Sequence, residues 1–384
     1  MAKLLDIAKH IQDAGGESYY VGGYVRDELL GKASKDIDIE IHNISESDFL
    51  NILHQAGIKT ELVGESFGVY KAVIDGDDFD FSFPRRERST GEKHTDFEIV
   101  VDPFMGTKEA STRRDFTFNS IMKNVMTNEL VDHHNGKADL EAGIIRHVSD
   151  QFAEDPLRVF RAAQFASRFN FDVADETKAL CRTIPLDGLA RERVETEFKK
   201  AITKSNQPSQ FFDVLCEIKH PESIWFAEVD GKDTKIIDKY ADSPNAVNAT
   251  LFHLMPETYQ TVVNETDTKR FMTIHSGIHD CDMTDIPAVC MFRHQTTDFT
   301  FEYMETTLGH DVSEMRQAYE KALPHLPSGQ DLLELGHTPG KEFGETLRKA
   351  QVMVFAGMNK DDVLAELNPL AESLADLSPD SIEL

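Results

Sequence analysis

The stretch that decides the fold is YYVGGYVRDELLGKASKDIDIEI, residues 19–41. It opens with a short apolar and aromatic run typical of a strand, turns at Gly22 and Gly23, and continues into a helix that ends near Gly31. Two glycines at a strand-to-helix turn let the backbone approach a phosphate closely, and the amides at a helix start favour an anion. Two adjacent glycines without a further motif more often form only a turn, so a phosphate site needs support from neighbouring segments.

The strand that follows carries an acidic face. A period of two places Asp36, Asp38 and Glu40 on one side and three isoleucines on the other, which we expect to be buried against helices. Carboxylates this close repel one another unless a divalent cation bridges them, and hard oxygen ligands suit Mg²⁺. Together with the glycine turn, two such carboxylates predict a metal site next to a phosphate-binding site. This arrangement is typical of enzymes that catalyse phosphoryl or nucleotidyl transfer. An edge strand with a solvated acidic face is the alternative interpretation.

A third carboxylate stands in FDFSF, residues 79–83. Alternation buries three phenylalanines on one face and leaves Asp80 and Ser82 on the other. If this strand lies beside residues 36–41, Asp80 is a ligand or a proton acceptor near an attacking hydroxyl. A solvent-facing Asp80 on a half-buried strand is an equally good interpretation.

The composition bounds the class of protein. The chain has 384 residues, 40% hydrophobic and 28% charged, which is typical of a soluble globular protein of two or three domains. Its net charge of -28 argues against a generic nucleic-acid-binding surface. Residues 1–210 carry 27 Lys and Arg against 37 Asp and Glu, and residues 211–384 carry 13 against 31. Any contact with a polyanion is therefore expected in the first half.

Two further features concern location. No stretch approaches the roughly 18 apolar residues that span a bilayer, so we predict no membrane partner. The four cysteines show neither paired spacing nor metal-ligand spacing, which indicates reduced thiols. Together they predict a cytoplasmic protein.

Hydrophobic spacing divides the chain. Residues 18–110 alternate short strand-like runs with turn signals, which predicts a mixed sheet with flanking helices. From about residue 150 the apolar spacing changes to three and four, and residues 154–169 and 190–202 are the clearest helices.

Five segments then occur in order: VGGYVRDELLG at 21–31, KDIDI at 35–39, TRRDFTFNSIM at 112–122, EDPLRVFRAAQFASRF at 154–169 and ARERVETEF at 190–198. Together they resemble the motifs of class II CCA-adding enzymes and bacterial poly(A) polymerases, one branch of the DNA polymerase β-type nucleotidyltransferases. The resemblance covers roughly residues 18–230. It implies an α+β fold with a nucleotidyltransferase head, or palm, whose mixed sheet has flanking helices. An all-helical neck, body and tail would follow. The domains it implies are a head at 1–145, a neck with the nucleotide-templating helix at 146–208, and a body and tail at 209–384 that binds tRNA or is degenerate.

The resemblance also implies roles for individual residues. The catalytic carboxylates that would hold Mg²⁺ are Asp36 and Asp38. The residues of the glycine turn that would bind the triphosphate are Gly22, Gly23 and Arg26. In the 112–122 segment, Arg114 and Asp115 would contact the nucleotide. Asp115 is expected near the ribose hydroxyls that distinguish NTP from dNTP.

Residues 154–169 predict a helix that selects the base. Asp155, Arg158 and Arg161 recur every three residues along one stripe, with Asp155 as the N-cap and Pro156 in the first turn. A carboxylate only accepts hydrogen bonds and a guanidinium only donates. Cytosine and adenine both present an amine beside a ring-nitrogen acceptor, whereas guanine and uracil present a carbonyl and an N–H. A buried mismatch of this kind discriminates by about 10⁴. For an isolated segment, a surface ion pair is the alternative interpretation.

Two positions near this helix leave alternatives open. Arg193 and Glu197 stand four residues apart on the next helix and either position the template helix or form a plain exposed pair. Gln164 stands where relatives commonly have another arginine, which removes one positive charge from the stripe.

The main functional prediction is a template-independent tRNA nucleotidyltransferase. It would add CCA to the tRNA 3′ end from CTP and ATP by two-metal nucleotidyl transfer, with Mg²⁺ as cofactor, as a monomer or weak dimer. The alternative is a poly(A) polymerase or A-adding enzyme acting on RNA 3′ ends. Poly(A) relatives tend to carry a basic segment where residues 63–68 read VGESFG, and this acidic replacement favours CCA addition.

The connection at residues 84–96 resembles the family's flexible loop, which implies addition of the terminal A. A non-catalytic RNA-binding protein is a third possibility, which the intact DID and RRD segments disfavour.

Overall fold

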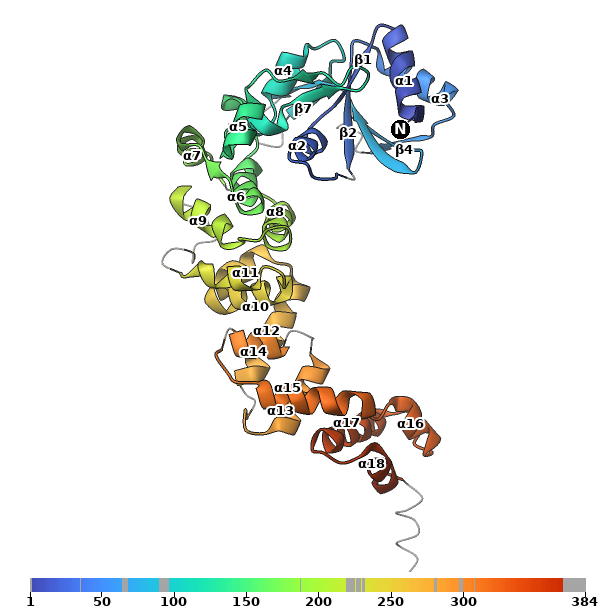
Figure 1. Cartoon of the computed structure of the whole chain (residues 1–384), viewed down its shortest axis with the longest axis vertical. Coiled ribbons are helices and arrows are strands. Elements are labelled where there is room, and N and C mark those ends of the chain that lie inside the picture. Colours follow the sequence, from blue (N-terminus) through green and yellow to red (C-terminus); the bar gives the residue numbers. More distant parts are fainter. Residues whose placement is uncertain are drawn as a thin grey trace, which may run out of the picture. The chain divides into compact units, whose positions relative to one another are not determined.

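Figure 1 shows the computed structural model of the chain. The described chain forms two compact units, Met1–Asp230 and Gly231–Leu384. Of the predicted segments at 63–68 and 84–96, residues 64–67 and 90–96 lie outside the described residues. Residues 85–89 of the expected flexible loop form a strand. The predicted boundaries at 145 and 208 stay predictions. The structure describes residues 2–34, 36–63, 68–89, 97–186, 188–218, 225, 229, 232–279, 282–296, 300–306 and 308–368.

The first unit contains a seven-stranded mixed sheet with the order β3-β4-β5-β2-β1-β8-β9. Strand β2 runs parallel to β5 and antiparallel to β1. The strands predicted before the glycine turn, at residues 36–41 and at residues 79–83 correspond to β1, β2 and β5. The strands are β1 (Glu17–Tyr20), β2 (Ile37–His42), β3 (Thr60–Val63), β4 (Val69–Ile74), β5 (Asp77–Ser82), β6 (Arg85–Ser89), β7 (Phe97–Val101), β8 (Met122–Asn124), β9 (Leu130–Val131), β10 (Ile144–Ile145) and β11 (Asp172–Val173).

Helices of the first unit flank the sheet and then follow it along the chain. The helices predicted at 154–169 and 190–202 are confirmed as α6 and α8, and α6 packs against both α8 and α9. The helices and 3-10 turns are α1 (Ala2–Asp13), α2 (Gly23–Leu29), α3 (Glu46–Gln55), α4 (Thr107–Thr112), η1 (Thr117–Asn119), α5 (Gly136–Ala142), η2 (Asp150–Glu154), α6 (Leu157–Phe169), α7 (Asp175–Cys181), α8 (Arg191–Thr203) and α9 (Ser209–Ile218).

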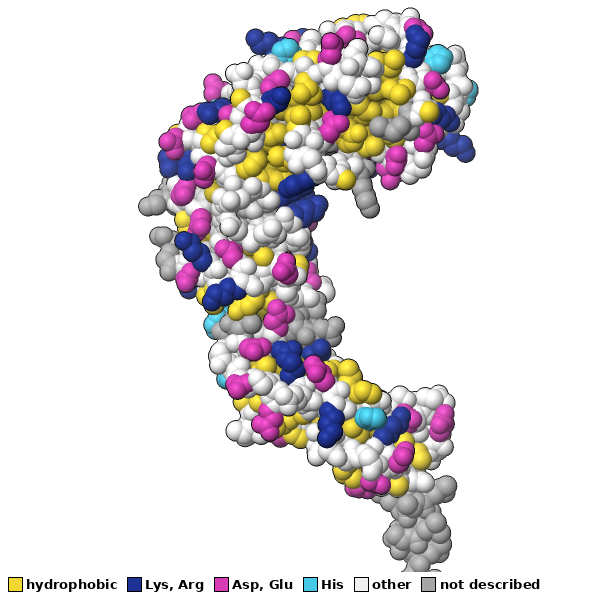
Figure 2. Space-filling model, viewed as in Figure 1, with side chains coloured by type: hydrophobic (Ala, Val, Ile, Leu, Met, Phe, Trp, Pro, Cys, Tyr) yellow, Lys and Arg dark blue, Asp and Glu magenta, His cyan; other side chains and the backbone are white. Residues whose placement is uncertain are grey.

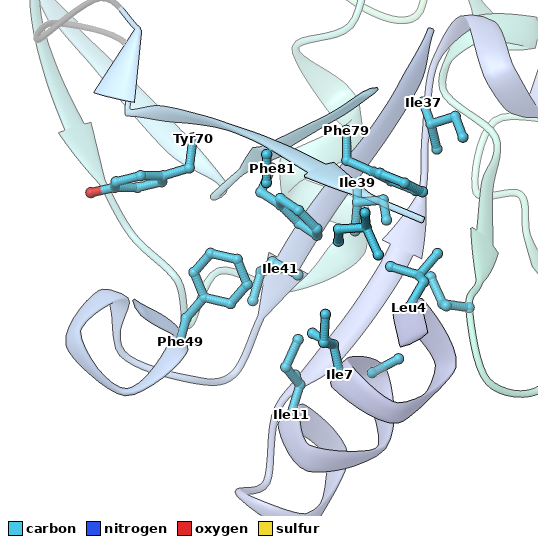
Figure 3. Packing of buried hydrophobic residues seen from close by; sticks show 14 of the residues in the cluster. Leu4, Ile7, Ile11, Ile37, Ile39, Ile41, Phe49, Tyr70, Phe79 and Phe81 are labelled. Carbon is cyan, nitrogen blue, oxygen red and sulfur yellow. The ribbon is translucent and has the colours of Figure 1, made fainter. Parts of the chain in front are cut away.

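One face of the sheet buries the main hydrophobic core (Figure 3). Ile39 and Ile41 of β2 are fully buried there beside the apolar side chains of α1 and α3, as the alternation predicts. The ring of Phe49 lies 5.4 Å from that of Phe81 and 5.5 Å from that of Phe83. Because strand side chains alternate, Asp38 lies on the opposite face of β2.

A second aromatic cluster fixes α6 to the residues of and next to η1. The ring of Phe165 meets those of Phe116 and Phe118 edge to face, each at 5.6 Å. Edge-to-face pairs of buried rings add to the stability that their burial already provides. The predicted template helix is therefore held against the part of the unit that carries the acidic strand.

The second unit is helical over its described residues. The rings of Tyr319 and Phe355 stack at 5.6 Å, and the guanidinium of Arg293 lies over Tyr319. Its elements are η3 (Thr234–Tyr240), α10 (Pro244–Leu254), α11 (Pro256–Val262), α12 (Glu265–His279), α13 (Ile286–Gln295), α14 (Thr300–Thr306), α15 (Ser313–Ala322), η4 (Leu323–His325), α16 (Gly329–Glu334), α17 (Lys341–Phe355) and α18 (Lys360–Glu366).

The surface carries charges of both signs. Figure 2 shows acidic and basic side chains interspersed on the visible face of each unit. Within the described ranges, no helix combines the length and the apolar character needed to cross a membrane.

Candidate active site

The glycine turn opens a gap between a carboxylate and a guanidinium. Strand β1 ends at Tyr20, and Gly22 adopts φ 65°, a conformation that residues with a side chain rarely adopt. An ideal Cβ at Gly22 would lie 3.7 Å from Arg114 Nη1 and 3.8 Å from Asp38 Oδ2. The absence of a side chain therefore keeps the space between Arg114 and Asp38 open.

The acidic residues meet at the junction of β2 and β5. Asp38 stands directly opposite Asp80 in the parallel register of these strands, so the neighbourhood on which the role of Asp80 depended is present. Asp36 precedes β2 and is exposed. The Nζ of Lys71 lies 3.7 Å from Asp80 Oδ2.

The electrostatics of Asp38 indicate an incompletely neutralised carboxylate. Burial raises the pKa of Asp38, and the nearby carboxylate of Asp80 raises it further. Arg114 opposes this increase, but the side chain of Asp38 forms no hydrogen bond or ion pair with any residue that the structure describes. A cation at this position would relieve the repulsion.

The donor set fits Mg²⁺ held partly by substrate. Across the described residues, no three His, Cys, Asp or Glu side chains converge into a complete metal cage. Mg²⁺ usually needs only one or two protein carboxylates because substrate phosphates and water complete its shell. Asp38 and Asp80 lie side by side and offer hard oxygen donors, with Asp36 close by in the sequence.

Arg114 is anchored at one of its nitrogens. Its Nη2 donates to Glu40 Oε2 at 2.9 Å, and its Nε is buried without a hydrogen-bond partner in the described chain. A buried donor without a partner costs free energy, so this Nε favours binding of an acceptor. The face of β2 that carries the carboxylates thus holds Arg114 through Glu40. The sequence pattern placed Glu40 on this face but assigned it no role.

Asp115 is buried and fully engaged within the protein. It accepts hydrogen bonds from Arg161 Nε at 2.8 Å and from Asn119 Nδ2 at 3.0 Å. Burial alone would raise the pKa of Asp115, but Arg161 and Asn119 outweigh burial and hold the pKa below its usual value. Arg161 also lies 3.7 Å from Glu197, so it connects the segment before η1 with α8.

Arg26 is directed into the protein. All three of its guanidinium nitrogens donate to Asp27 or Asn119, and its guanidinium lies over the ring of Phe169 at 4.9 Å. Burial lowers the pKa of Arg26. The structure therefore gives Arg26 a role in joining α2 to η1 and α6, while its part in triphosphate binding stays a prediction.

The two predicted base-reading residues are held at the start of α6. Asp155 accepts from the backbone N–H of Leu157 and from Arg193 Nη2, the latter at 2.9 and 3.1 Å. Arg158 donates to the backbone carbonyls of Gln151 at 2.9 Å and Arg113 at 2.7 Å. The helix begins at Leu157 with Pro156 as its N-cap, one residue later than predicted.

Most predicted site residues line one cavity of about 410 Å³. Its lining consists of Gly22, Gly23, Arg26, Asp38, Arg114, Asp115, Asn119, Asp155, Arg158 and Arg161. Asn119 was not predicted as a site residue, although it lies within the 112–122 segment. Residues far apart in the sequence thus converge as the resemblance implies.

A second cavity of about 540 Å³ is lined by residues of β2, β3, β4 and β5. Its charged lining consists of five acidic residues, Asp36, Asp38, Glu61, Asp78 and Asp80, and two basic residues, Lys59 and Lys71. No sequence motif marks these lysines, because Lys71 lies within β4 and Lys59 directly precedes β3. Asp38 belongs to both cavities.

The part of the chain that contains the seven-stranded sheet matches a known protein family. Residues 18–146 match the family described as the Poly A polymerase head domain. This segment is similar to the poly A polymerase head domain. Gly22, Asp38, Asp80 and Arg114 all lie within the head domain, whereas Asp155 lies beyond it.

Curated relatives extend the similarity beyond the head domain. The chain is 39% identical over 203 residues to the multifunctional CCA protein of Nitrosococcus oceani, covering 52% of this chain and 48% of that protein. It is 38% identical over 209 residues to the CCA-adding enzyme of Marinobacter nauticus, covering 53% of each. The chain thus spans about half the length of these relatives. A longer match, 28% identical over 376 residues, links 93% of this chain with 83% of the multifunctional CCA protein of Cupriavidus necator.

Solved structures establish the fold. The CCA-adding enzyme of Bacillus stearothermophilus in complex with CTP superimposes with a TM-score of 0.70 at 20% identity, covering 98% of both chains. The Thermotoga maritima CCA-adding enzyme complexed with tRNA_CCA gives a TM-score of 0.63 at 19% identity, covering 97% of this chain and 94% of that one. The predicted α+β head followed by a helical region is confirmed.

Proposed function

We propose that this chain is a tRNA nucleotidyltransferase that adds C, C and A in turn to tRNA 3′ ends from CTP and ATP. The observation that carries the proposal is that Asp38 lines two cavities at once. A transfer reaction needs two substrates to meet at one group. The cavity beside Arg114 suits the nucleotide, and the cavity beside Lys71 suits the RNA 3′ end.

The nucleotide cavity offers a place for phosphates. Arg114 Nη1 borders the gap at Gly22, and the buried Nε of Arg114 has no hydrogen-bond partner among the described residues. Phosphate oxygens are strong acceptors for guanidinium groups. The gap is also next to Asp38, so a bound phosphate would lie beside the carboxylates.

In the proposed reaction the RNA 3′ hydroxyl oxygen attacks the α-phosphorus of the nucleotide. A new P–O bond forms while the bond from the α-phosphorus to the bridging oxygen breaks, and pyrophosphate leaves. Asp80, on the RNA side, is the proposed acceptor of the hydroxyl proton. Mg²⁺ held by Asp36 and Asp38 would stabilise the charge on the phosphate oxygens when bound.

The start of α6 supports the choice of C and A. Asp155 supplies only acceptors and Arg158 only donors, and both line the nucleotide cavity. The two carbonyls that bind Arg158 fix the plane of its guanidinium. A base with an amine beside a ring-nitrogen acceptor can pair with both residues, whereas guanine or uracil leaves both unpaired.

The comparisons support this proposal by name. Relatives of this chain are called multifunctional CCA protein or CCA-adding enzyme, and structures of the same fold were solved with CTP and with tRNA_CCA. The name of the head domain family also keeps poly(A) addition as the second candidate. A cytoplasmic location and a monomeric or weakly dimeric state stay predictions from the sequence.

Product sizing tests the proposal. Transcripts of one tRNA that end at the discriminator base, at C or at CC are incubated with Mg²⁺ and with each NTP alone or with CTP plus ATP. For the transcript that ends at the discriminator base, we expect two additions with CTP, three with CTP plus ATP, and then a stop. The transcripts that end at C and at CC should receive one and two fewer additions. A long ladder with ATP alone would establish the poly(A) alternative, and no addition in any mixture would refute both functions.

Two variants connect the activity with the site. Asp38→Asn should abolish addition, because the carboxylate shared by the cavities is lost. Asp77→Asn makes the same chemical change at an exposed position of β5 outside both cavities and should leave addition intact. Equal activity of the two variants would contradict the assignment of the site.

A further inference from the structure

Glu40 is a buried carboxylate whose two oxygens have separate partners. It is 7% exposed and lies two residues after Asp38 on the same face of β2. Oε2 accepts from Arg114 Nη2 at 2.9 Å, and Oε1 lies 2.9 Å from His42 Nε2. Burial alone would raise the pKa of Glu40, but Arg114 and His42 outweigh burial and lower it.

His42 fixes the orientation of this carboxylate. The ring is 1% exposed, its Nδ1 lies 3.1 Å from the carbonyl oxygen of Met105, and Tyr19 packs against it edge to face at 5.5 Å. A carbonyl only accepts, so Nδ1 carries a proton. The contact at Nε2 then needs a second proton, on the ring or on the carboxylate. Either arrangement ties Oε1 to His42 and leaves Oε2 for Arg114.

Arg114 is aimed by this bond. With Nη2 held by Glu40, Nη1 borders the empty Cβ position of Gly22, and Nε stays buried with no partner in the described chain. An unanchored arginine side chain has many rotamers, and fixing one of them before binding saves that ordering cost.

We propose that Glu40, itself fixed by His42, is a positioning residue that directs Arg114 toward the phosphates of the incoming nucleotide. This inference rests on the proposed function. Glu40 lines neither cavity, so it acts through Arg114 and does not touch the substrate. A guanidinium displaced by about 1 Å lowers the rate of a transfer reaction by up to roughly 100-fold.

Steady-state kinetics with CTP and a CC-lacking tRNA test the role. Glu40→Ala should lower kcat/KM for CTP by roughly 10- to 100-fold and leave the Kd for tRNA within twofold. Glu40→Gln should recover most of the loss, because its amide oxygen can accept from Arg114 while its NH₂ donates to a neutral His42. Glu40→Asp, one methylene shorter, should resemble the alanine variant.

A double-mutant cycle separates positioning from a merely structural role. If Glu40 acts through Arg114, Glu40→Ala should cause no further loss of kcat/KM in an Arg114→Ala background. Glu28→Ala is the control: it removes another long-range ion pair of the head domain, with Lys123 at 2.7 Å, outside both cavities. We expect its kcat/KM to equal that of the unmodified chain.

The outcomes distinguish the two proposals. An unmodified chain that adds no nucleotide refutes the proposed function. An active chain whose Glu40→Ala variant keeps its kcat/KM, or loses the same factor with and without Arg114, overturns the positioning role alone. If Glu40→Ala does not fold, the Gln and Asp variants decide, and equal activities of these two variants overturn the role.

Discussion

Arg193 of α8 donates to both carboxylate oxygens of Asp155, at 3.1 Å to Oδ1 and 2.9 Å to Oδ2. Asp155 stands just before α6, so this ion pair joins the start of one helix to the first turn of another. The pair supports the interpretation in which Arg193 positions the predicted template helix, here through Asp155. An exposed pair of this kind contributes little stability on its own.

Removal of the base-reading carboxylate should relax specificity. Asp155→Ala should lower the ratio of kcat/KM for CTP over UTP by at least ~100-fold, because the acceptor for the base amine is lost. Arg193→Ala should lower the ratio by about tenfold, since the carboxylate stays but its orientation is free. Arg191→Ala, two positions earlier on α8 and outside the cavities, serves as the control. A CTP preference that survives Asp155→Ala would refute the templating role.

A side chain at Gly22 should be unfavourable, because the positive φ strains it and its Cβ would occupy the space between Arg114 and Asp38. Gly22→Ala should lower the free energy of unfolding by about 1–2 kcal/mol for its positive φ, and should also weaken CTP binding. Gly31→Ala is a matched control, because Gly31 has φ 68° but nothing within 4 Å of its Cβ position. Denaturant unfolding and calorimetric CTP titration measure the two effects. Equal CTP affinity in both variants would remove Gly22 from the nucleotide site.

The second cavity should affect RNA and not the nucleotide. Lys71 lines it beside Asp80, so Lys71→Met should raise the KM for tRNA about tenfold at low salt while the KM for CTP stays constant. Lys9→Met, an exposed position on α1 that pairs with Asp13, provides the control. A change confined to the KM for CTP would exchange the assignments of the two cavities.

The Asp115–Arg161 pair should give a defined pH dependence of stability. The pKa of Asp115 is lowered on folding, so its contribution is complete above the unfolded-state value of 3.8 and is lost as the pH falls further. Asp115→Asn should therefore cost about 3 kcal/mol of unfolding free energy equally at pH 7 and pH 5.5. The difference in unfolding free energy between this variant and the unmodified chain should become smaller only below pH 3.8. Urea unfolding at several pH values measures it, and a cost that already falls between pH 7 and pH 5.5 would contradict the assignment.

Sequence patterns predicted the strands that bury one face. Residues 37–41 and 79–83 alternate strictly, and their isoleucines and phenylalanines do enter the core. Strand β3 escaped prediction because all four of its residues are exposed and no apolar period marks it. Helix α5 also escaped prediction; Asp132 accepts from the backbone N–H groups of Gly136 and Lys137 and stabilises the helix start.

Long-range partners lay beyond the sequence patterns. Alternation placed Glu40 beside Asp38, but its partner Arg114 is 74 residues away, and only the fold brings them together. The engagement of Arg26 by Asn119, 93 residues away, was likewise invisible and alters the interpretation of the glycine turn. Local periodicity reports burial, whereas the pairing of buried charges depends on the tertiary structure.

The position of Asp38 in the wall between two cavities has a consequence for inhibitor design. A compound confined to the space near Arg114 would compete with the nucleotide alone, and one confined to the space near Lys71 would compete with the RNA alone. A bisubstrate inhibitor that extends past Asp38 into both would be competitive against each. Its affinity would also benefit from the linkage of two weak fragments.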